Sequence, residues 1–307
     1  MRRLGVLVIV LAVVSPLAPL RAGMVEDTLG PSEPRREFEK GFVEYLPIDR
    51  QSESTLSSWD DPHVGGWGGV LPGDIDGDDE CVRRPRLRPV VFVHGTTEDA
   101  WFWRAAENDA TVDVRERFLA AGWCPDQLWA ISYTGGKGYF TYNDINADEV
   151  AEFIDAVRRY TRAPKVDVVT HSLGVTVFRK AAFEHPKLYR RVANVVAIAG
   201  ANEGVTTCRG LGTAQGSEVC IELEPGSEWL AELNSIGQTP RGPSYLALYD
   251  PVGDQFYQGP DARSPRLEGG CNHEMPGAFH NGLARGPLAV STYIPFLQGG
   301  QLPACHP

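Results

Sequence analysis

Short apolar runs alternate with helical stripes from about residue 89 to residue 297. Runs rich in Val, Ile and Leu are typical of buried strands, and apolar residues that recur every three or four positions are typical of helices. The predicted strands are Pro89–Val93, Leu128–Tyr133, Val166–Thr170, Val192–Ala199 and Ser244–Tyr249. The predicted helices are Val112–Ala121, Asp144–Arg162, Val175–Glu184 and Leu288–Leu297. This strict alternation predicts an α/β fold with a doubly wound, mostly parallel sheet covered by helices on both faces.

The N-terminal part of the chain lacks this alternation. A short positive stretch precedes the apolar run Leu4–Val14, and small residues follow as far as Gly23. This pattern predicts a secretion signal over residues 1–23. A membrane anchor is the alternative, but prolines interrupt the run before it reaches the ~20 residues that a span needs. No later stretch has that length, so we expect no membrane anchor after cleavage. Residues 24–85 are rich in Asp, Glu, Pro, Ser and Gly, which predicts an irregular N-terminal extension before a main domain at residues 86–307.

Acidic residues outnumber basic ones, 40 to 29, which gives a formal net charge of −11. A surface of this charge repels nucleic acid and anionic lipid, so neither is an expected partner. The densest acidic stretch, Asp74–Glu80, begins like a calcium-binding loop. However, Asp79 stands where such a loop needs Gly, and Pro85 stands where it needs the closing Glu, so we expect a solvated acidic loop instead.

The chain has an even set of six cysteines: Cys81, Cys124, Cys208, Cys220, Cys271 and Cys305. In an exported chain this number allows up to three disulfides. The pairing stays open, although the short loop between Cys208 and Cys220 makes that pair the least costly, and a bond between Cys271 and Cys305 would tie back the C-terminus. No Cys-x-x-Cys pair is present, so neither a metal site nor a redox centre is indicated.

The predicted strand at residues 166–170 leads through His171-Ser172-Leu173-Gly174 directly into a helix. This context is typical of a nucleophile elbow, in which a serine occupies a tight turn between strand and helix. Ser172 is therefore the candidate nucleophile, and Gly174 gives the helix room to approach. Thr170 replaces the usual first Gly, and a strand position tolerates a threonine. An ordinary helix N-cap is the alternative role for this serine.

An earlier strand, Pro89–Val93, ends in His94-Gly95-Thr96. In elbow hydrolases, one backbone N–H from this loop and the N–H after the nucleophile bind the oxyanion of the reaction. Thr96 and Leu173 are the candidate donors. The alternative is a plain turn at the end of the strand with His94 packed inside.

A serine nucleophile needs a histidine base and an acid, in the chain order Ser, acid, His for this architecture. Asp250 and Asp254 both follow the strand that ends at residue 249. We favour Asp254, because Asp250 stands before Pro251, where it is suited to start the turn. The candidate base is His280, in a Gly-flanked loop before the last helix, with His273 as the alternative.

Residues 200–243 separate two predicted strands and are long enough to form a cap or pocket wall. Within them, Trp229 lies on a predicted short helix and is a candidate for contact with substrate. Trp101 and Trp103 follow the oxyanion loop and are also substrate-binding candidates, because three successive aromatic residues cannot all face one core. The alternative for each tryptophan is packing against the sheet or under the N-terminal extension.

The chain from about Pro89 to Leu297 resembles extracellular bacterial lipases of the α/β-hydrolase fold, and especially the lipase-like polyhydroxyalkanoate depolymerases. The segments that carry the resemblance are Val90–Gly95, Phe153–Gly174, Val195–Gly200, Cys208, Glu224–Asn234, Asp254-Gln255 and Gly277–Leu283. The resemblance implies that residues 86–307 form a catalytic domain. It also implies a triad of Ser172, Asp254 and His280, with oxyanion donors at Thr96 and Leu173.

The expected function is hydrolysis of a carboxylic ester through an acyl-enzyme, with a lipid or polyester as substrate and no cofactor. Triglycerides, small esters and polyhydroxybutyrate all remain open as substrates. A peptidase or amidase would use the same triad. A catalytically silent hydrolase relative that binds a ligand or partner is the alternative from another functional class.

Overall fold

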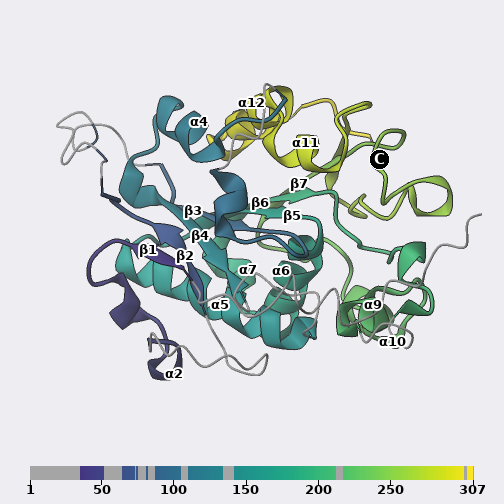
Figure 1. Cartoon of the computed structure of the whole chain (residues 1–307), viewed down its shortest axis with the longest axis horizontal. Coiled ribbons are helices and arrows are strands. Elements are labelled where there is room, and N and C mark those ends of the chain that lie inside the picture. Colours follow the sequence, from purple (N-terminus) through teal and green to yellow (C-terminus); the bar gives the residue numbers. More distant parts are fainter. Residues whose placement is uncertain are drawn as a thin grey trace, which may run out of the picture. The chain divides into compact units, whose positions relative to one another are not determined.

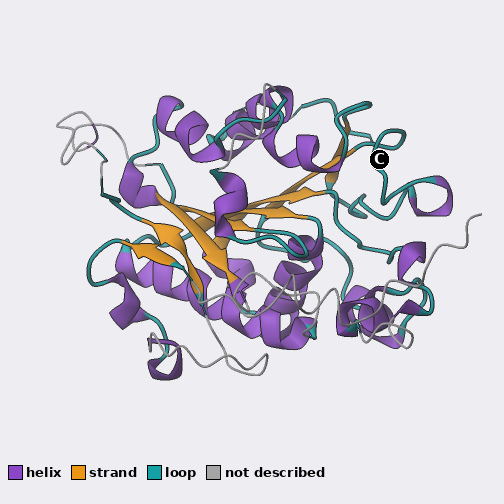
Figure 2. Ribbon diagram, in the orientation of Figure 1, coloured by secondary structure: helices purple, strands orange, loops and turns teal. Residues whose placement is uncertain are grey.

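An eight-stranded, mostly parallel sheet runs through the described part of the chain (Figures 1 and 2). The computed structural model describes residues 35–51, 64–72, 74, 81, 87–104, 110–133, 142–211, 217–300 and 303–306. The strands are β1 (Arg36–Phe38), β2 (Gly65–Gly68), β3 (Val90–Val93), β4 (Leu128–Ser132), β5 (Val166–His171), β6 (Val192–Ile198), β7 (Ser244–Tyr249) and β8 (Cys271–Glu274). Their order is β1-β2-β4-β3-β5-β6-β7-β8, and β2 is antiparallel to β4 whereas the other described pairs are parallel.

Helices cover both faces of the sheet (Figure 1). They are α2 (Ile48–Gln51), α4 (Val114–Ala120), α5 (Asn143–Tyr160), α6 (Leu173–Glu184), α7 (Leu188–Arg191), α9 (Glu218–Leu223), α10 (Glu228–Asn234), α11 (His280–Arg285) and α12 (Pro287–Leu297). Short 3-10 helices are η1 (Phe42–Tyr45), η2 (Ala100–Trp103), η3 (Pro125–Gln127), η6 (Thr206–Cys208) and η7 (Gly259–Asp261). Helices α5 and α6 lie side by side on one face, and α4 and α12 lie on the other.

The predicted alternation of strands and helices is confirmed. Each of the five predicted strands and four predicted helices is present with ends within two residues of the expected ones. The strands β3, β4 and β5 are buried along their whole length, because helices on both faces exclude water from a central parallel sheet. Their high content of valine and other apolar residues is the pattern that predicts them from the sequence.

The region 24–85 differs from the irregular extension expected from its composition, because it contributes β1, β2 and α2. Strand β2 has the sequence Gly-Gly-Trp-Gly, which carries no β-branched signal. A Cβ at Gly66 would lie 2.0 Å from the Ala130 carbonyl oxygen, so glycine is what lets this strand approach β4. Trp67 between the glycines is buried and donates its indole N–H to the Ala100 carbonyl oxygen. The predicted secretion signal, residues 1–23, lies outside the described residues.

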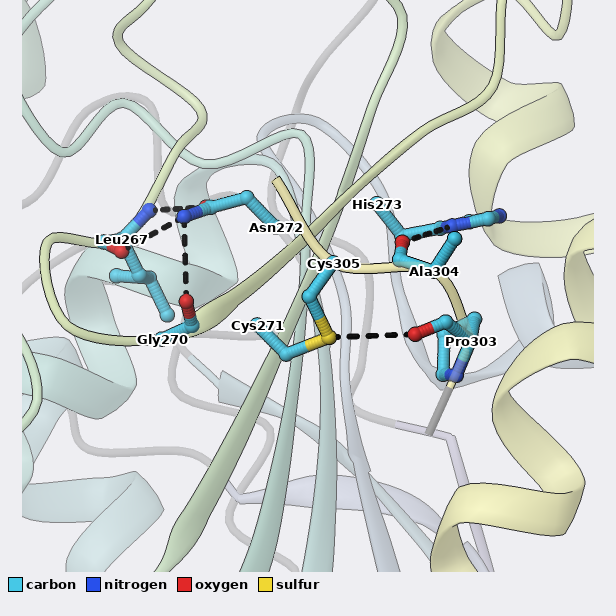
Figure 3. Close-up of a disulfide and its surroundings, with 8 residues drawn as sticks. All are labelled: Leu267, Gly270, Cys271, Asn272, His273, Pro303, Ala304 and Cys305. Carbon is cyan, nitrogen blue, oxygen red and sulfur yellow. Dashed lines mark hydrogen bonds between the residues drawn. A yellow bond between two sulfur atoms is a disulfide. The ribbon is translucent and has the colours of Figure 1, made fainter. Parts of the chain in front are cut away.

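Three disulfides connect the chain, and two of them are the pairs favoured from the sequence. Cys208 bonds to Cys220, and Cys271 bonds to Cys305. The third disulfide joins Cys81 to Cys124. Figure 3 shows how the Cys271–Cys305 bond brings the C-terminal segment beside β8, where the ring of His273 faces the Ala304 carbonyl oxygen. This segment covers the outer edge of β8, which would otherwise expose unpaired backbone groups.

Of the acidic stretch Asp74–Glu80, the described residues include only Asp74. Its carboxylate accepts hydrogen bonds from the Leu71 N–H and from the Arg115 guanidinium, 2.6 Å from Nη2. The remaining residues of the stretch lie outside the described ones. Among the described residues, no group of His, Cys, Asp or Glu is suited to hold a metal ion. No helix in this part of the chain is long and apolar enough to cross a bilayer.

Candidate active site

Ser172 lies on a sharp turn between β5 and α6. Its backbone has φ 54° and ψ −123°, a left-handed conformation that non-glycine residues rarely adopt and that costs free energy. Two glycines allow the neighbouring loop to lie against this turn. A Cβ at Gly95 would lie 2.9 Å from the Ser172 Cβ, and a Cβ at Gly174 would lie 2.3 Å from the His94 carbonyl oxygen. The turn therefore has the geometry of a nucleophile elbow, unlike an ordinary N-cap, and the Ser172 side chain makes no cap hydrogen bond.

Thr170 occupies the position where such elbows usually have a small residue. It is fully buried, and its hydroxyl donates a hydrogen bond to the Val196 carbonyl oxygen on β6 at 3.0 Å. The hydroxyl is thus satisfied between the two strands, which explains how the site accommodates a threonine.

Asp254 and His280 form a buried pair. The Asp254 Oδ2 lies 2.8 Å from the His280 Nδ1, and its Oδ1 accepts the Phe256 N–H at 3.0 Å. Asp250, the alternative acid, has a different set of partners. Its carboxylate accepts the N–H groups of Val252, Gly253 and Phe279, so it connects the loop after β7 with the loop that carries His280.

The environment of His280 lowers its pKa. Burial is the main cause, the nearby His171 acts in the same direction, and the hydrogen bond to Asp254 opposes both. The Phe256 and His171 rings lie 4.6 and 4.7 Å from the His280 ring. A lowered pKa leaves the imidazole neutral near pH 7, the state in which it accepts a proton. The alternative base, His273, faces Ala304 at the edge of the sheet.

One cavity of about 460 Å³ brings the candidate residues together. Ser172, Leu173, Thr96 and His280 all line it. The Ser172 hydroxyl makes no hydrogen bond to His280 in the described structure, and such bonds are often long before substrate binds. The far wall is mainly apolar and includes Val205, Leu211, Val219, Leu223 and the Cys208–Cys220 disulfide. Residues 200–243 thus supply a wall of this cavity, as expected from their length.

Thr96 and Leu173, the candidate oxyanion donors, both line this cavity. Neither backbone N–H group donates to any acceptor within the described residues. By contrast, the Gly95 N–H is already used, because it donates to the Glu98 carboxylate at 2.8 Å. An oxyanion site needs backbone donors of this kind that have no other acceptor.

The structure does not bring the three tryptophan candidates to this cavity. Trp103 is fully buried and packs on Phe92 with ring centroids 5.3 Å apart. The Arg35 guanidinium carbon lies over the Trp101 ring, 4.3 Å from the centroid of that ring. Trp229 is on α10, and its indole N–H donates to Asp144. The three tryptophans therefore pack elsewhere, and the prediction that they contact substrate in this cavity is wrong. Aliphatic side chains line the cavity in their place.

Sequence reasoning missed Glu98 as a part of this site. Glu98 Oε2 lies 3.2 Å from the His171 Nδ1, and the His171 Nε2 lies 3.3 Å from the His280 carbonyl oxygen. Burial alone would raise the pKa of Glu98, but His171, the Gly95 N–H and His94 together oppose it, and the pKa is lowered. No local motif marks this residue, because its side-chain partner His171 is 73 positions away in the sequence.

Comparisons with known proteins agree with this architecture. A family model described as lipase (class 2) matches residues 87–258. The mature lipase BlEst2 of Bacillus licheniformis superposes with a TM-score of 0.55 and 17% identity, over 70% of this chain and 93% of that one. Lipase B of Aspergillus fumigatus has a TM-score of 0.57 and 15% identity, over 90% of this chain and 66% of that one. These matches confirm the α/β-hydrolase fold and support the lipase part of the resemblance, but not the polyhydroxyalkanoate depolymerase part.

Proposed function

The chain belongs to the class 2 lipase family, and on this premise we propose that it is a secreted serine hydrolase of lipid esters. The observation that carries the proposal is the buried Asp254–His280 pair in the same site as a strained Ser172. A buried acid–histidine pair whose histidine lines the same cavity as a half-buried serine suits nucleophilic catalysis and has no evident packing role.

In the proposed reaction, the His280 Nε2 takes the proton of Ser172 while the Ser172 Oγ attacks the ester carbonyl carbon. Asp254 holds the His280 Nδ1–H and stabilises the imidazolium that forms. The N–H groups of Thr96 and Leu173 donate to the oxyanion of the tetrahedral intermediate. His280 then protonates the departing alkoxide, and water hydrolyses the acyl-enzyme by the same proton transfers in reverse order.

Two other functions use the same fold. A polyhydroxyalkanoate depolymerase would cleave the same bond in a polyester, so it differs only in the substrate that the site admits. A catalytically silent binding protein would have no need for the strained φ of 54° at Ser172 or for the buried acid–histidine pair. Secretion is supported by the three disulfides, because such bonds persist in oxidising compartments.

Activity is expected to rise with pH through the pKa of His280, because only the neutral imidazole takes the serine proton. Burial lowers that pKa below its ordinary 6.5, so the rise in kcat/KM should be centred below pH 6.5. Hydrolysis of p-nitrophenyl butyrate, measured from ~pH 4 to ~pH 8, checks this expectation. A rise centred above about pH 7 would show that another group, or a differently placed His280, controls the reaction.

The substrate is tested with p-nitrophenyl esters of increasing acyl length, emulsified triglyceride and polyhydroxybutyrate film. The proposal expects turnover of the p-nitrophenyl esters and of triglyceride. Faster release of soluble product from polyhydroxybutyrate than from triglyceride would favour the depolymerase function. If the wild-type protein cleaved no ester at all, the binding function would replace the enzymatic one.

A further inference from the structure

A second hollow adjoins the cavity that contains Ser172, and His280 lines both. This groove has a volume of about 680 Å³ and is formed by residues 273–282, 286–289 and neighbouring side chains, at the beginnings of α11 and α12. It shares Gln255, His280 and Asn281 with the cavity, so the two hollows are neighbours. Ser172, Thr96 and Leu173 line the cavity but not the groove.

The chemistry of ester cleavage indicates which half of the ester each hollow holds. The ester carbonyl must lie between the Ser172 Oγ and the N–H groups of Thr96 and Leu173, so the acyl half occupies the cavity that contains them. The leaving alkoxide receives its proton from His280, so the alcohol half must pass the imidazole ring. A groove that contacts His280 and lacks the nucleophile is therefore on the alcohol side.

We propose that this groove binds the alcohol half of the ester, and that it selects an uncharged, apolar alcohol. This inference rests on the proposed ester hydrolysis. It adds a binding site for the alcohol half, because the cavity accounts only for the acyl half. A diacylglycerol or a long-chain alcohol satisfies this description. A phosphate-bearing alcohol, such as the glycerophosphocholine of a phospholipid, does not.

The lining of the groove supports an apolar occupant. Phe279 and Leu288 line it with 62% and 72% of their surface exposed, although large apolar side chains normally bury more. Ala278 and Met275 extend the same apolar surface inward. Burying these side chains against a substrate would stabilise the complex by removing apolar area from water.

The charges around the groove argue against an anionic occupant. No Lys or Arg is among the described residues that line it. Glu274 accepts the Tyr249 hydroxyl at 2.6 Å, and His273 faces the Ala304 carbonyl oxygen. A phosphate in the groove would therefore lack a cationic partner and would lie near a carboxylate, which disfavours its transfer from water.

The test uses butyrate esters of methanol, 1-butanol and 1-octanol below their solubility limits, with acid release followed at constant pH. We compare the wild-type chain with Leu288→Ser and with the control Ile48→Ser, an 87% exposed apolar residue on α2 that does not line the groove. Both changes are at exposed positions, where substitutions seldom affect folding. The octyl-to-methyl ratio of kcat/KM should exceed one in the wild type and fall about fivefold in Leu288→Ser, because an exposed leucine contributes part of its full burial energy. It should not change in Ile48→Ser.

Two results would overturn the proposal: no preference for the longer alcohol in the wild type, or the same preference in Leu288→Ser as in the wild type. A third comparison uses monoacylglycerol and lysophosphatidylcholine with the same acyl chain, and we expect faster cleavage of the uncharged lipid. Equal or faster cleavage of lysophosphatidylcholine would also overturn it. If the wild type cleaves none of the three butyrates, the proposed function fails; if it cleaves them without discrimination between alcohols, only the groove assignment fails.

An independent observation concerns Glu98, and we infer that it is a positioning residue. One carboxylate oxygen of Glu98 accepts the Gly95 N–H at 2.8 Å and lies 3.2 Å from the His171 Nδ1. His171 in turn reaches the His280 carbonyl oxygen, and its ring stacks on Phe102 at 4.9 Å. This chain of contacts joins the loop of the oxyanion donors, the nucleophile turn and the loop of the base.

Because Glu98 touches no reacting atom, its effect is expected on the geometry of the transition state and not on substrate affinity. Glu98→Ala should lower kcat about 10²-fold with little change in KM, as expected when catalytic groups shift by about 1 Å. Glu98→Gln, which keeps an acceptor for Gly95, should recover part of this loss. Asp99→Asn is the matched control, because Asp99 is on the same loop and its carboxylate accepts the Trp101 N–H. A normal kcat in Glu98→Ala, with or without a lower melting temperature, would contradict the inference.

Discussion

Replacing Ser172 by alanine is expected to lower kcat for ester hydrolysis by about 10⁶-fold, the scale seen when the nucleophile of a serine triad is removed. The variant should fold normally, because alanine and serine are almost equally strained at a φ of 54° and the serine side chain makes no cap hydrogen bond. Turnover of p-nitrophenyl butyrate and the melting temperature measure the two effects separately.

The matched control is Ser235→Ala, at an exposed position after α10 that does not line the cavity. It should keep wild-type turnover. If Ser172→Ala retained more than about 1% of the activity, a different nucleophile would be at work and the residual oxyanion site alone would not explain the rate.

The second large effect is expected from Asp254→Asn, which should lower kcat by about 10⁴-fold because an amide stabilises the wrong tautomer of the histidine. Asp254 and His280 are both buried, so the geometry around the pair should persist while the charge is lost. Asparagine no longer stabilises the imidazolium that forms during attack. The measurement is kcat at the pH optimum, together with a structure or melting curve of the variant.

Asp250→Asn is the control for this prediction, since Asp250 is only four residues away. The N–H groups of Val252, Gly253 and Phe279 hold the charged form of Asp250, and its pKa is lowered although burial opposes this. Loss of the Asp250 charge should therefore destabilise the two loops and lower kcat by about tenfold at most. The opposite pattern, with the larger loss in Asp250→Asn, would transfer the role of triad acid to Asp250.

The part of the fold that is readable from sequence is the part in which local pattern and tertiary burial agree. Val90–Val93 is an unbroken apolar run and Val166–His171 is rich in valine, because both faces of a central sheet are covered. Strand β2 escaped prediction because its glycines serve a close approach to β4 and resemble loop composition. The hydrophobic pattern therefore predicts the central strands of the sheet but not the glycine-rich strand β2.

The candidate triad was assembled from motif, strand ends and chain order, and the structure places its acid and base in contact. Chain order alone could not separate Asp254 from Asp250, because the choice depends on which carboxylate turns back toward His280. The tryptophans were misplaced for a similar reason: a residue type reports apolar character but not the face on which it lies. The role of Glu98 depends on the contact between Glu98 and His171, 73 positions apart, and on the contact between His171 and His280, 109 positions apart, which no local pattern records.

The central claim is that Ser172, Asp254 and His280 act as one catalytic unit with the N–H groups of Thr96 and Leu173. A crystal structure of the chain after reaction with an alkyl p-nitrophenyl phosphonate tests it most directly, because the phosphonate mimics the tetrahedral intermediate. We expect phosphorus bonded to the Ser172 Oγ, the phosphoryl oxygen within hydrogen-bond distance, about 3 Å, of both N–H groups, and the His280 Nε2 facing the alkoxy oxygen. Phosphorus on another residue, or an adduct on Ser172 with His280 and the two N–H groups turned away from it, would contradict the account.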